Sequence, residues 1–503
     1  MSSSEDIRTT TTVDHLIVGA GFGGLCTAIK LNEAGESDFV VIEKDSDVGG
    51  TWHINTYPGA ACDVPSQLYS FSFALNPDWT SAFSPQPEIQ AYIRRVAEES
   101  GTLDRFVFDT AVTDATWDQD AQRWLVRTTG ATYAARSLIV GSGGLSEPKL
   151  PDIDGIDSFQ GEVFHSARWN HEAELAGKRI AVIGTGASAV QIVPELQKVA
   201  ARVDVYQRTP NWVIPRNERS FTALEKAVFR RLPVVQRAAR AAVYAGLEAR
   251  VPAFTRLPAL MNVVEAVAKR NIRRGITDPE LRKRVTPTYR AGCKRILISN
   301  TWYPALDSDN VELVTDPIVK VTPSGIVTAD GAEREIDVLV VATGFHVTDQ
   351  PMASHVTGRD GRTLAETWAE RGMRAYKGTT VHGFPNYFHL VGPNTALGHS
   401  SMIFIIESQV AYLTEALRTM RSQRLATVEP TIEAQDSWSD RVQARMKPTV
   451  WTTGGCASWY LDEHGNNTTL WPGQTFTLRR LLSRFDLDQY DVRPVEQREA
   501  VSA

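Results

Sequence analysis

A glycine-rich turn near the start of the chain has the spacing that cradles a dinucleotide pyrophosphate. The apolar run at 16–18 leads into GAGFGG at 19–24, a helical pattern follows, and a second apolar run at 39–42 ends in Glu43. A lone GxGxxG is weak evidence, but a strand, a glycine turn, a helix and an acid in this order form a specific signature. The stretch therefore predicts a dinucleotide-binding unit rather than an ordinary glycine turn.

Each residue type in this unit has a physical reason. Gly19 permits the tight turn, Gly21 lets the backbone approach a pyrophosphate, and Gly24 lets the helix pack closely on the strand. The free N–H groups and the partial positive charge of the helix N-terminus attract the phosphates. Glu43 is expected to accept hydrogen bonds from ribose hydroxyls.

A second unit of this kind covers residues 179–209, with an apolar strand at 180–183 and GTGASA at 184–189. Gly184 and Gly186 take the first two glycine positions, and an alanine takes the third, as the motif allows. Glu43 follows the first glycine of its unit by 24 positions, and the residue at the same spacing after Gly184 is Arg208. An acid suits a free 2′-hydroxyl, whereas an arginine attracts a 2′-phosphate. We therefore assign FAD to the first unit and NADPH to the second. Further contacts to NADPH are assigned to Thr185, Ser188 and Thr209.

Two more apolar strands run into glycine, at 138–140 before Gly141 and at 338–341 before Ala-Thr-Gly at 342–344. Their similarity indicates that each nucleotide domain has a returning strand beside its cofactor. The predicted fold class is α/β, with two Rossmann-like dinucleotide-binding domains, for FAD and NADPH, and a helical insert in the NADPH domain.

The order of these segments predicts discontinuous domains. We expect an FAD-binding domain in two parts, 1–147 and 383–503, the second containing a buried helix from Met402 to Leu417. We expect the linker and the first part of the NADPH-binding domain at 148–215, a helical insert at 216–290 with breaks at Pro233, Pro252 and Pro258, and the second part of the NADPH-binding domain at 291–382.

The predicted insert is rich in Arg and Lys. A basic amphipathic insert can touch a membrane surface or a partner. We prefer the simpler interpretation, a solvated helical cap whose charge favours an anionic cofactor.

Composition limits the remaining classes. The 503 residues carry a formal net charge of −6, with 42% hydrophobic and 22% charged residues, which is typical of a globular protein and not of a nucleic-acid binder. The four cysteines (Cys26, Cys62, Cys293 and Cys456) are far apart and form no CxxC, so neither a disulfide framework nor a zinc cluster is expected. No signal-like apolar segment and no run of about 18 apolar residues is present, so we expect a cytoplasmic protein.

Two longer motifs lie between and beside the nucleotide units. Residues 49–63 read GGTWHINTYPGAACD, and the stretch from Phe159 to Asn170 reads FQGEVFHSARWN. Here the sequence resembles the flavin-dependent Baeyer–Villiger monooxygenases, whose fingerprint is F-x-G-x-x-x-H-x-x-x-W followed by Pro or Asp and whose second signature is [A/G]-G-x-W-x-x-x-x-[F/Y]-P-[G/M]-x-x-x-D. The second signature matches in full. The fingerprint departs only at Asn170, which keeps the turn-forming habit of Asp.

The resemblance covers nearly the whole chain and implies roles for individual residues. Arg295, in Gly-Cys-Lys-Arg-Ile at 292–296, matches the active-site arginine, and Asp63 matches the carboxylate that pairs with it. Lys294 matches a lysine that joins Arg208 at the 2′-phosphate. Positions that match contacts to the flavin cofactor are Gly50, Thr51, Trp52, Asp63, Tyr69, Val112 and Met402. His165 and Trp169 match linker residues that couple the domains.

The implied activity is the oxidation of a ketone by O₂ and NADPH to an ester or lactone, through a C4a-peroxyflavin and a Criegee intermediate, with sulfoxidation as a side activity. A fixed guanidinium stabilises both anions in a low-dielectric site. Candidate substrates are cyclic, linear and aryl ketones, and the sequence does not choose among them or indicate an oligomeric state.

Two alternatives stay open at this stage. An N- or S-hydroxylating flavin monooxygenase usually has Tyr or Phe in place of Trp169, and a fixed cation disfavours the neutral hydroperoxyflavin that it needs. A flavoprotein that only senses redox state or docks a partner is expected to lose key residues, and every matched residue is kept. A disulfide reductase would need a paired redox cysteine motif, which is absent from the sequence.

Overall fold

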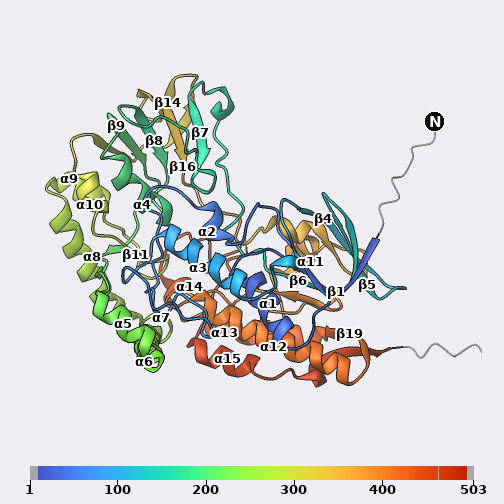
Figure 1. Cartoon of the computed structure of the whole chain (residues 1–503). Coiled ribbons are helices and arrows are strands. Elements are labelled where there is room, and N and C mark those ends of the chain that lie inside the picture. Colours follow the sequence, from blue (N-terminus) through green and yellow to red (C-terminus); the bar gives the residue numbers. More distant parts are fainter. Residues whose placement is uncertain (1–9, 463, 496–503) are drawn as a thin grey trace, which may run out of the picture.

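The computed structural model describes residues 10–462 and 464–495 and contains two separate sheets built largely from parallel strands. In Figure 1 the first sheet lies to the right and the second at the upper left, with α2 (Thr51–Ile54) between them. The predicted α/β fold with two dinucleotide-type sheets is therefore confirmed.

The first sheet contains both parts of the predicted FAD unit. Its order is β17-β4-β5-β6-β1-β2-β3, and β18 pairs with the end of β6. Its strands are β1 (Thr10–Val18), β2 (Phe39–Ile42), β3 (Phe106–Val107), β4 (Val112–Asp118), β5 (Arg123–Thr128), β6 (Thr132–Val140), β17 (Val356–Thr357) and β18 (Tyr387–His389). Strand β1 is parallel to both β2 and β6, which brings the glycine turn and the returning strand to one carboxyl edge.

The second sheet has the order β12-β9-β8-β16-β7, and every pairing in it is parallel. Its strands are β7 (Glu162–His165), β8 (Arg179–Ile183), β9 (Arg202–Tyr206), β12 (Val311–Val314) and β16 (Val338–Val341). A small antiparallel sheet of β13 (Ile318–Val321), β14 (Gly325–Thr328) and β15 (Glu333–Glu335) leads into β16.

Both glycine turns press against a returning strand, which explains the residues found there. Gly19 has φ +96°, and a Cβ on it would lie 2.9 Å from the Gly141 carbonyl oxygen. Gly184 has φ +116°, and a Cβ on it would lie 2.4 Å from the Ala342 carbonyl oxygen. A Cβ on Gly24 would lie only 1.7 Å from the Gly19 carbonyl oxygen, so the close packing of helix on strand requires glycine.

Helices cover the first sheet on the side of the glycine turn. Helix α1 (Phe22–Glu33) and helix α12 (Met402–Ser422) pack against each other and share one apolar core with α3 (Gln86–Glu99), α13 (Ile432–Met446) and α15 (Thr475–Leu482). Strands β19 (Leu425–Pro430) and β20 (Tyr490–Pro494) close this layer as an antiparallel pair. The second core lies between β8, β9, α4 (Ala187–Leu196) and α10 (Trp302–Leu306).

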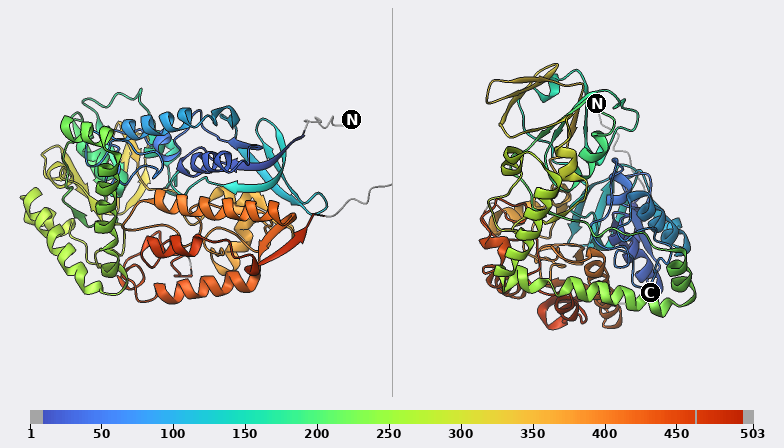
Figure 2. Two further views of the ribbon diagram at one scale, coloured as in Figure 1. Left: turned by 60° about the horizontal axis from the view of Figure 1, so that its bottom comes forward. Right: turned by 90° about the vertical axis from the view of Figure 1, so that its left-hand side faces the viewer.

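The segment 216–290 is helical, with α5 (Ala223–Arg231), α6 (Pro233–Glu248), α7 (Val251–Thr255), α8 (Met261–Gly275) and α9 (Pro279–Arg284). Figure 2 shows these helices wrapping one end of the molecule. Pro233 and Pro252 stand in the first turns of α6 and α7, where proline costs no hydrogen bond. Inward-facing polar groups dock α6 on the first domain: Arg240 donates to the Gln67 and Leu68 carbonyls, and Gln236 donates to the Asn76 carbonyl.

One predicted boundary differs from the strand pairing. We expected residues 291–382 to belong with the NADPH domain, but β17 pairs with β4 in the first sheet, and α11 (Leu364–Arg371) packs in the same core. The chain therefore returns to the first sheet before residue 356. The sequence placed this return at residue 383 because the short β17 carries little pattern of its own. None of the described helices is long and apolar enough to cross a membrane.

The cysteine spacings predicted no disulfide framework, but the structure contains one disulfide that this argument missed. Cys293 and Cys456, which are 163 positions apart, form a disulfide, whereas Cys26 and Cys62 are buried free thiols. The sequence argument failed because it weighed only close spacings, and these two cysteines meet through the fold. The bond links the segment before Lys294 and Arg295 to the loop after α14 (Val450–Thr453).

Replacing Cys456 with serine is expected to destabilise the fold by about 2–4 kcal/mol, because the disulfide restricts a long loop of the unfolded chain. The measurement is the thermal midpoint of wild type and Cys456→Ser with and without dithiothreitol. The wild type should lose stability on reduction and the variant should not. Equal midpoints of the two proteins in non-reducing buffer would contradict this role.

Candidate active site

The signature loop 49–63 connects the two nucleotide folds. Near its start, Gly50 has a φ of +53°, and a Cβ on it would lie 3.0 Å from the Cα of Gly21, so this position demands glycine. Its far end docks on α4 of the second domain: the Tyr57 hydroxyl donates to Gln191 Oε1 at 3.0 Å, and Gln191 Nε2 donates to the Ala61 carbonyl at 2.9 Å. The loop therefore links the first glycine turn to α4 of the second nucleotide fold through direct hydrogen bonds.

Asp63, the last residue of this loop, forms a bidentate ion pair with Arg295. Arg295 Nε donates to Oδ2 at 2.7 Å and Nη2 donates to Oδ1 at 2.6 Å. The two side chains remain 30% and 27% exposed, so the pair is not sealed in the core and can face a ligand. Two parallel hydrogen bonds fix the plane of the guanidinium as well as its position.

Electrostatics keep this pair charged. Burial acts to raise the pKa of Asp63, but the charge and hydrogen bonds of Arg295 outweigh it, and the pKa is lowered below its usual value. The Asp63 charge in turn raises the pKa of Arg295. Arg295 therefore remains a cation at neutral pH.

Three further contacts hold the segment that carries Arg295. Arg295 Nη1 donates to the Leu397 carbonyl at 3.4 Å, and Cys293 is bonded to Cys456. Immediately after Arg295, β11 (Leu297–Ile298) pairs in parallel with β10 (Val213–Ile214). The sequence could not indicate these supports, because each joins residues far apart in the chain.

The residues predicted around the flavin gather beside the first glycine turn. Trp52 Nε1 donates to the Tyr69 hydroxyl at 2.9 Å, and the Tyr69 ring packs edge-on against Phe22 at 5.5 Å. Met402 begins α12 and is partly buried against the same core. Thr51 begins α2, and its carbonyl accepts hydrogen bonds from the backbone and side chain of Asn55.

Glu43 is held tightly against the glycine turn. Its Oε2 accepts from the Ala20 backbone N–H at 2.6 Å and its Oε1 from the Asp45 backbone N–H at 2.9 Å. Burial raises the pKa of this carboxyl despite those two hydrogen bonds. The Glu43 backbone N–H donates to the Val107 carbonyl, and its carbonyl accepts from the Thr110 N–H. Thr110 precedes Val112 by two positions, so Glu43 lies near the start of β4. Each carboxylate oxygen keeps a second lone pair site for a ribose hydroxyl.

The predicted phosphate site contains two cations, Arg208 and Lys294, whose charges influence each other. Burial lowers the pKa of Lys294, and the positive charge of Arg208 lowers it further. Arg208 is exposed, and neither cation forms an ion pair with an acid within residues 10–462 and 464–495. The turn beside them is ordered by Thr185, which donates to the Thr209 carbonyl at 3.2 Å, and Ser188 contacts the Tyr57 hydroxyl. Like charges held together without an acid suit a dianionic phosphate.

The linker residues take structural positions. His165 Nδ1 accepts from the Ala167 backbone N–H at 3.1 Å, and its ring packs edge-on against Phe345 in the loop after β16. Trp169 is buried against Phe164. Asn170 accepts from the Glu172 backbone N–H at 3.0 Å, which is the turn that Asp would make. The one departure from the family fingerprint therefore preserves the local backbone.

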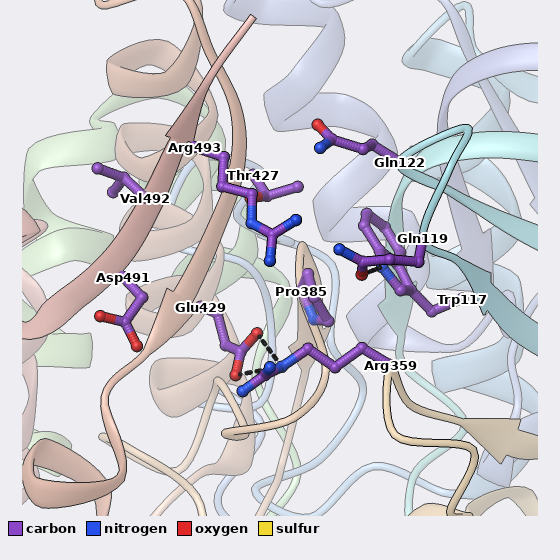
Figure 3. A pocket seen from close by; sticks show the side chains of 10 residues that line it. All are labelled: Trp117, Gln119, Gln122, Arg359, Pro385, Thr427, Glu429, Asp491, Val492 and Arg493. Atoms are coloured by element: carbon purple, nitrogen blue, oxygen red, sulfur yellow. Dashed lines mark hydrogen bonds and ion pairs between the residues drawn. The ribbon is translucent and has the colours of Figure 1, made fainter.

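The sequence missed Gln191 and the Leu397 carbonyl. Gln191 stands on a helix among apolar residues, where a polar residue is a weak signal, and a backbone carbonyl leaves no signal in the sequence. A separate cavity of about 190 Å³ is lined by residues of β4, β19, β20 and nearby loops. None of the residues that line it is a predicted site residue, and Figure 3 shows that its Arg359 and Glu429 pair with each other.

Two nucleotide-type folds and a partly exposed arginine–carboxylate pair are the arrangement that known relatives can be compared with. Residues 16–256 match the family described as pyridine nucleotide-disulphide oxidoreductase. A Baeyer-Villiger monooxygenase of Streptomyces coelicolor is 50% identical over 477 residues, which is 95% of this chain and 92% of that protein. Another of Pseudomonas aeruginosa is 47% identical, covering 94% and 90%.

Solved structures agree with these sequence relatives. A steroid monooxygenase bound to NADP is 31% identical with a TM-score of 0.84, covering 96% of this chain and all of the other. The cyclohexanone monooxygenase of Rhodococcus sp. Phi1 bound to NADP⁺ is 28% identical with a TM-score of 0.85, covering 97% and 100%. The chain belongs to the Baeyer–Villiger monooxygenase family, which confirms the family predicted from the two motifs.

Arg208→Ala should raise the KM for NADPH about tenfold and leave the KM for NADH nearly unchanged, because one charge-assisted hydrogen bond to the 2′-phosphate is lost. Initial rates with each nucleotide provide the measurement. Lys198→Ala removes an exposed cation of the same domain that is already paired with Glu195, and it should change neither value. Equal effects of Arg208→Ala on both nucleotides would refute the assignment.

The buried His165 predicts a pH dependence of stability. Burial lowers the pKa of His165 from 6.5 to about 4, so the folded protein keeps it neutral while the unfolded chain binds a proton. The part of the free energy of unfolding that depends on His165 is therefore highest above pH 6.5 and decreases as the pH falls towards 4. Between pH 7 and pH 5 the free energy of unfolding should decrease by about 2 kcal/mol for this reason. Thermal midpoints measured against pH should fall less steeply for His165→Asn, and an identical slope would contradict the argument.

Proposed function

We propose that the protein is an FAD-containing, NADPH-dependent monooxygenase that converts ketones to esters or lactones. The observation that carries this proposal is the bidentate Arg295–Asp63 pair, which is partly exposed beside the two nucleotide turns. Bound reduced flavin supplies the activation of O₂, and the remaining chemistry requires a fixed positive charge and exclusion of water.

Arg295 is suited to stabilise negative charge that develops at the reacting oxygen atoms. Its guanidinium cannot lose its proton at neutral pH, and Asp63 and the Leu397 carbonyl already fix its orientation. A preorganised cation needs no rearrangement when the charge develops, which is where electrostatic catalysis gains most. Asp63 orients this cation and does not itself need to transfer a proton.

The second cofactor is expected on the turn after β8. Arg208 and Lys294 are the residues that would hold the 2′-phosphate, and the N-terminus of α4 would face the pyrophosphate. Lys294 is the neighbour of Arg295, so the residues that bind NADPH and the residues that act on the substrate share one backbone segment. We infer that binding of the nucleotide steadies the position of Arg295.

Hydroxylation of an amine or sulfide is the competing activity. Trp169 and the fixed Arg295–Asp63 pair argue against it, since a permanent cation favours anionic over neutral oxygen species. We propose small-molecule ketones and O₂ as the substrates and no nucleic acid as a partner. We also propose a cytoplasmic location, which cell fractionation tests.

Arg295→Ala is expected to keep FAD and to lose ester formation by about 10²–10³-fold, because a preorganised group that stabilises charge is removed. The measurement is ester yield over a panel of cyclic, linear and aryl ketones, with FAD content from the visible spectrum. Arg295→Lys keeps the charge but not the two parallel hydrogen bonds, so it should lie between wild type and Arg295→Ala.

Full ester formation by Arg295→Ala would refute the role of Arg295. Ester formation lost together with FAD would point instead to a structural role for the residue. Conversion of amines or sulfides without any conversion of ketones in the wild type would favour the hydroxylating class.

A further inference from the structure

A buried polar cluster joins the helical insert to the loop between β18 and α12. Glu248, the last residue of α6, lies with its Oε1 3.2 Å from His399 Nε2. The same oxygen accepts from Thr475 Oγ1 at 2.7 Å, and Oε2 accepts from the Thr475 backbone N–H at 2.9 Å. The Glu248 and His399 side chains are only 7% and 1% exposed. A carboxylate this well buried needs such partners, and it has three hydrogen bonds.

The loop that carries His399 lies at the carboxyl edge of the first sheet. It leaves β18 at His389, where Val391 N–H donates to Gln409 Oε1, and it reaches α12, where Ser401 caps the helix. Between these points the Leu397 carbonyl accepts from Arg295. In the chain, His399 and Ser400 therefore lie between Leu397, which contacts Arg295, and the first turn of α12, in a loop on the edge where ligands of such sheets bind.

Two neighbouring polar atoms of this loop are buried without a hydrogen-bond partner among residues 10–462 and 464–495. They are His399 Nδ1 and Ser400 Oγ. A buried polar atom without a partner costs free energy, so two in succession call for an explanation. Both belong to the loop that follows β18 at the carboxyl edge of the first sheet, where a bound molecule would provide the missing partners.

Glu248 determines what the free nitrogen of His399 can accept. Burial acts to raise the pKa of Glu248, but the hydrogen bonds from His399 and Thr475 lower it, so the group is an ionised acceptor at neutral pH. Nε2 must then be the nitrogen that donates. In the neutral ring this leaves Nδ1 as an acceptor, next to a serine hydroxyl that can both donate and accept. The pair complements an N–H beside a carbonyl oxygen, which is an amide edge.

We propose that Glu248 is a positioning residue that fixes the tautomer of His399, and that His399 Nδ1 with Ser400 Oγ binds an amide edge of a bound cofactor. Two cofactors of the proposed function present this chemistry: the imide edge of the flavin ring and the carboxamide of nicotinamide. The inference rests on that function and gives the helical insert a task, since α6 supplies the carboxylate. No proton transfer to the substrate is assigned to this cluster.

Glu248→Gln tests the tautomer. The Gln carbonyl can still accept from Thr475, but its amide N–H then faces Nε2 and turns His399 Nδ1 from an acceptor into a donor. We expect about tenfold weaker binding of whichever cofactor supplies the amide edge. FAD release from diluted holoenzyme, followed by flavin fluorescence, reports on the flavin. Titration with NADP⁺, followed by the change in flavin absorption, reports on nicotinamide.

Ser400→Ala and Tyr244→Phe separate ligand binding from mere folding. Ser400→Ala removes an unsatisfied hydroxyl, so its cofactor-free form should be as stable as wild type or more stable, whereas cofactor binding should weaken. Tyr244→Phe removes the hydroxyl that contacts Thr475 Oγ1 at 2.8 Å in the same cluster, yet leaves the Glu248–His399 contact intact. It should change neither cofactor affinity.

The outcomes distinguish this inference from the proposed function. Weaker FAD binding in Glu248→Gln and Ser400→Ala assigns the amide edge to the flavin, and weaker NADP⁺ binding alone assigns it to nicotinamide. Unchanged affinity for both, with a lower thermal midpoint for Glu248→Gln, would overturn the inference and leave the cluster as a brace. These binding measurements need no turnover, so they stand even if the wild type oxidises no ketone.

Discussion

The ion pair between Arg295 and Asp63 crosses from one nucleotide domain to the other, and the site depends on it. Asp63 ends a loop that starts beside the first glycine turn and is docked on α4 through Gln191. Arg295 belongs to a segment that is fixed by a disulfide, by a strand pairing and by the Leu397 carbonyl. The charge that we propose acts beside the flavin is thereby held by contacts from several distant segments at once.

This arrangement explains why so much of the chain is devoted to support. The helical insert docks α6 on the first domain through Arg240 and Gln236 and ends in the buried carboxylate of Glu248. That carboxylate contacts His399, which lies in the same loop as the Leu397 carbonyl that binds Arg295. Electrostatic catalysis requires rigid placement of a few groups, and buried polar contacts of this kind provide it at the cost of desolvation.

The sequence predicted the two nucleotide units well because their signals are local. Gly19, Gly24 and Gly184 are required by close backbone approaches that the structure shows, and the match of residues 49–63 to the family signature contains Asp63. What it could not predict is contact between distant segments. The Cys293–Cys456 disulfide and the return of β17 to the first sheet both depend on tertiary packing, which no spacing rule encodes. The assignment of individual residues to cofactors stays a prediction.

The central claim is that a fixed cation directs oxygen activated at the flavin to a ketone. The most direct test reduces the purified protein with NADPH, mixes it with O₂ in a stopped-flow spectrometer and follows the near-ultraviolet flavin bands across the ketone panel. We predict a long-lived oxygenated flavin that decays faster when a ketone is present and yields an ester. Immediate reoxidation with release of hydrogen peroxide, unaffected by every ketone, would contradict the account.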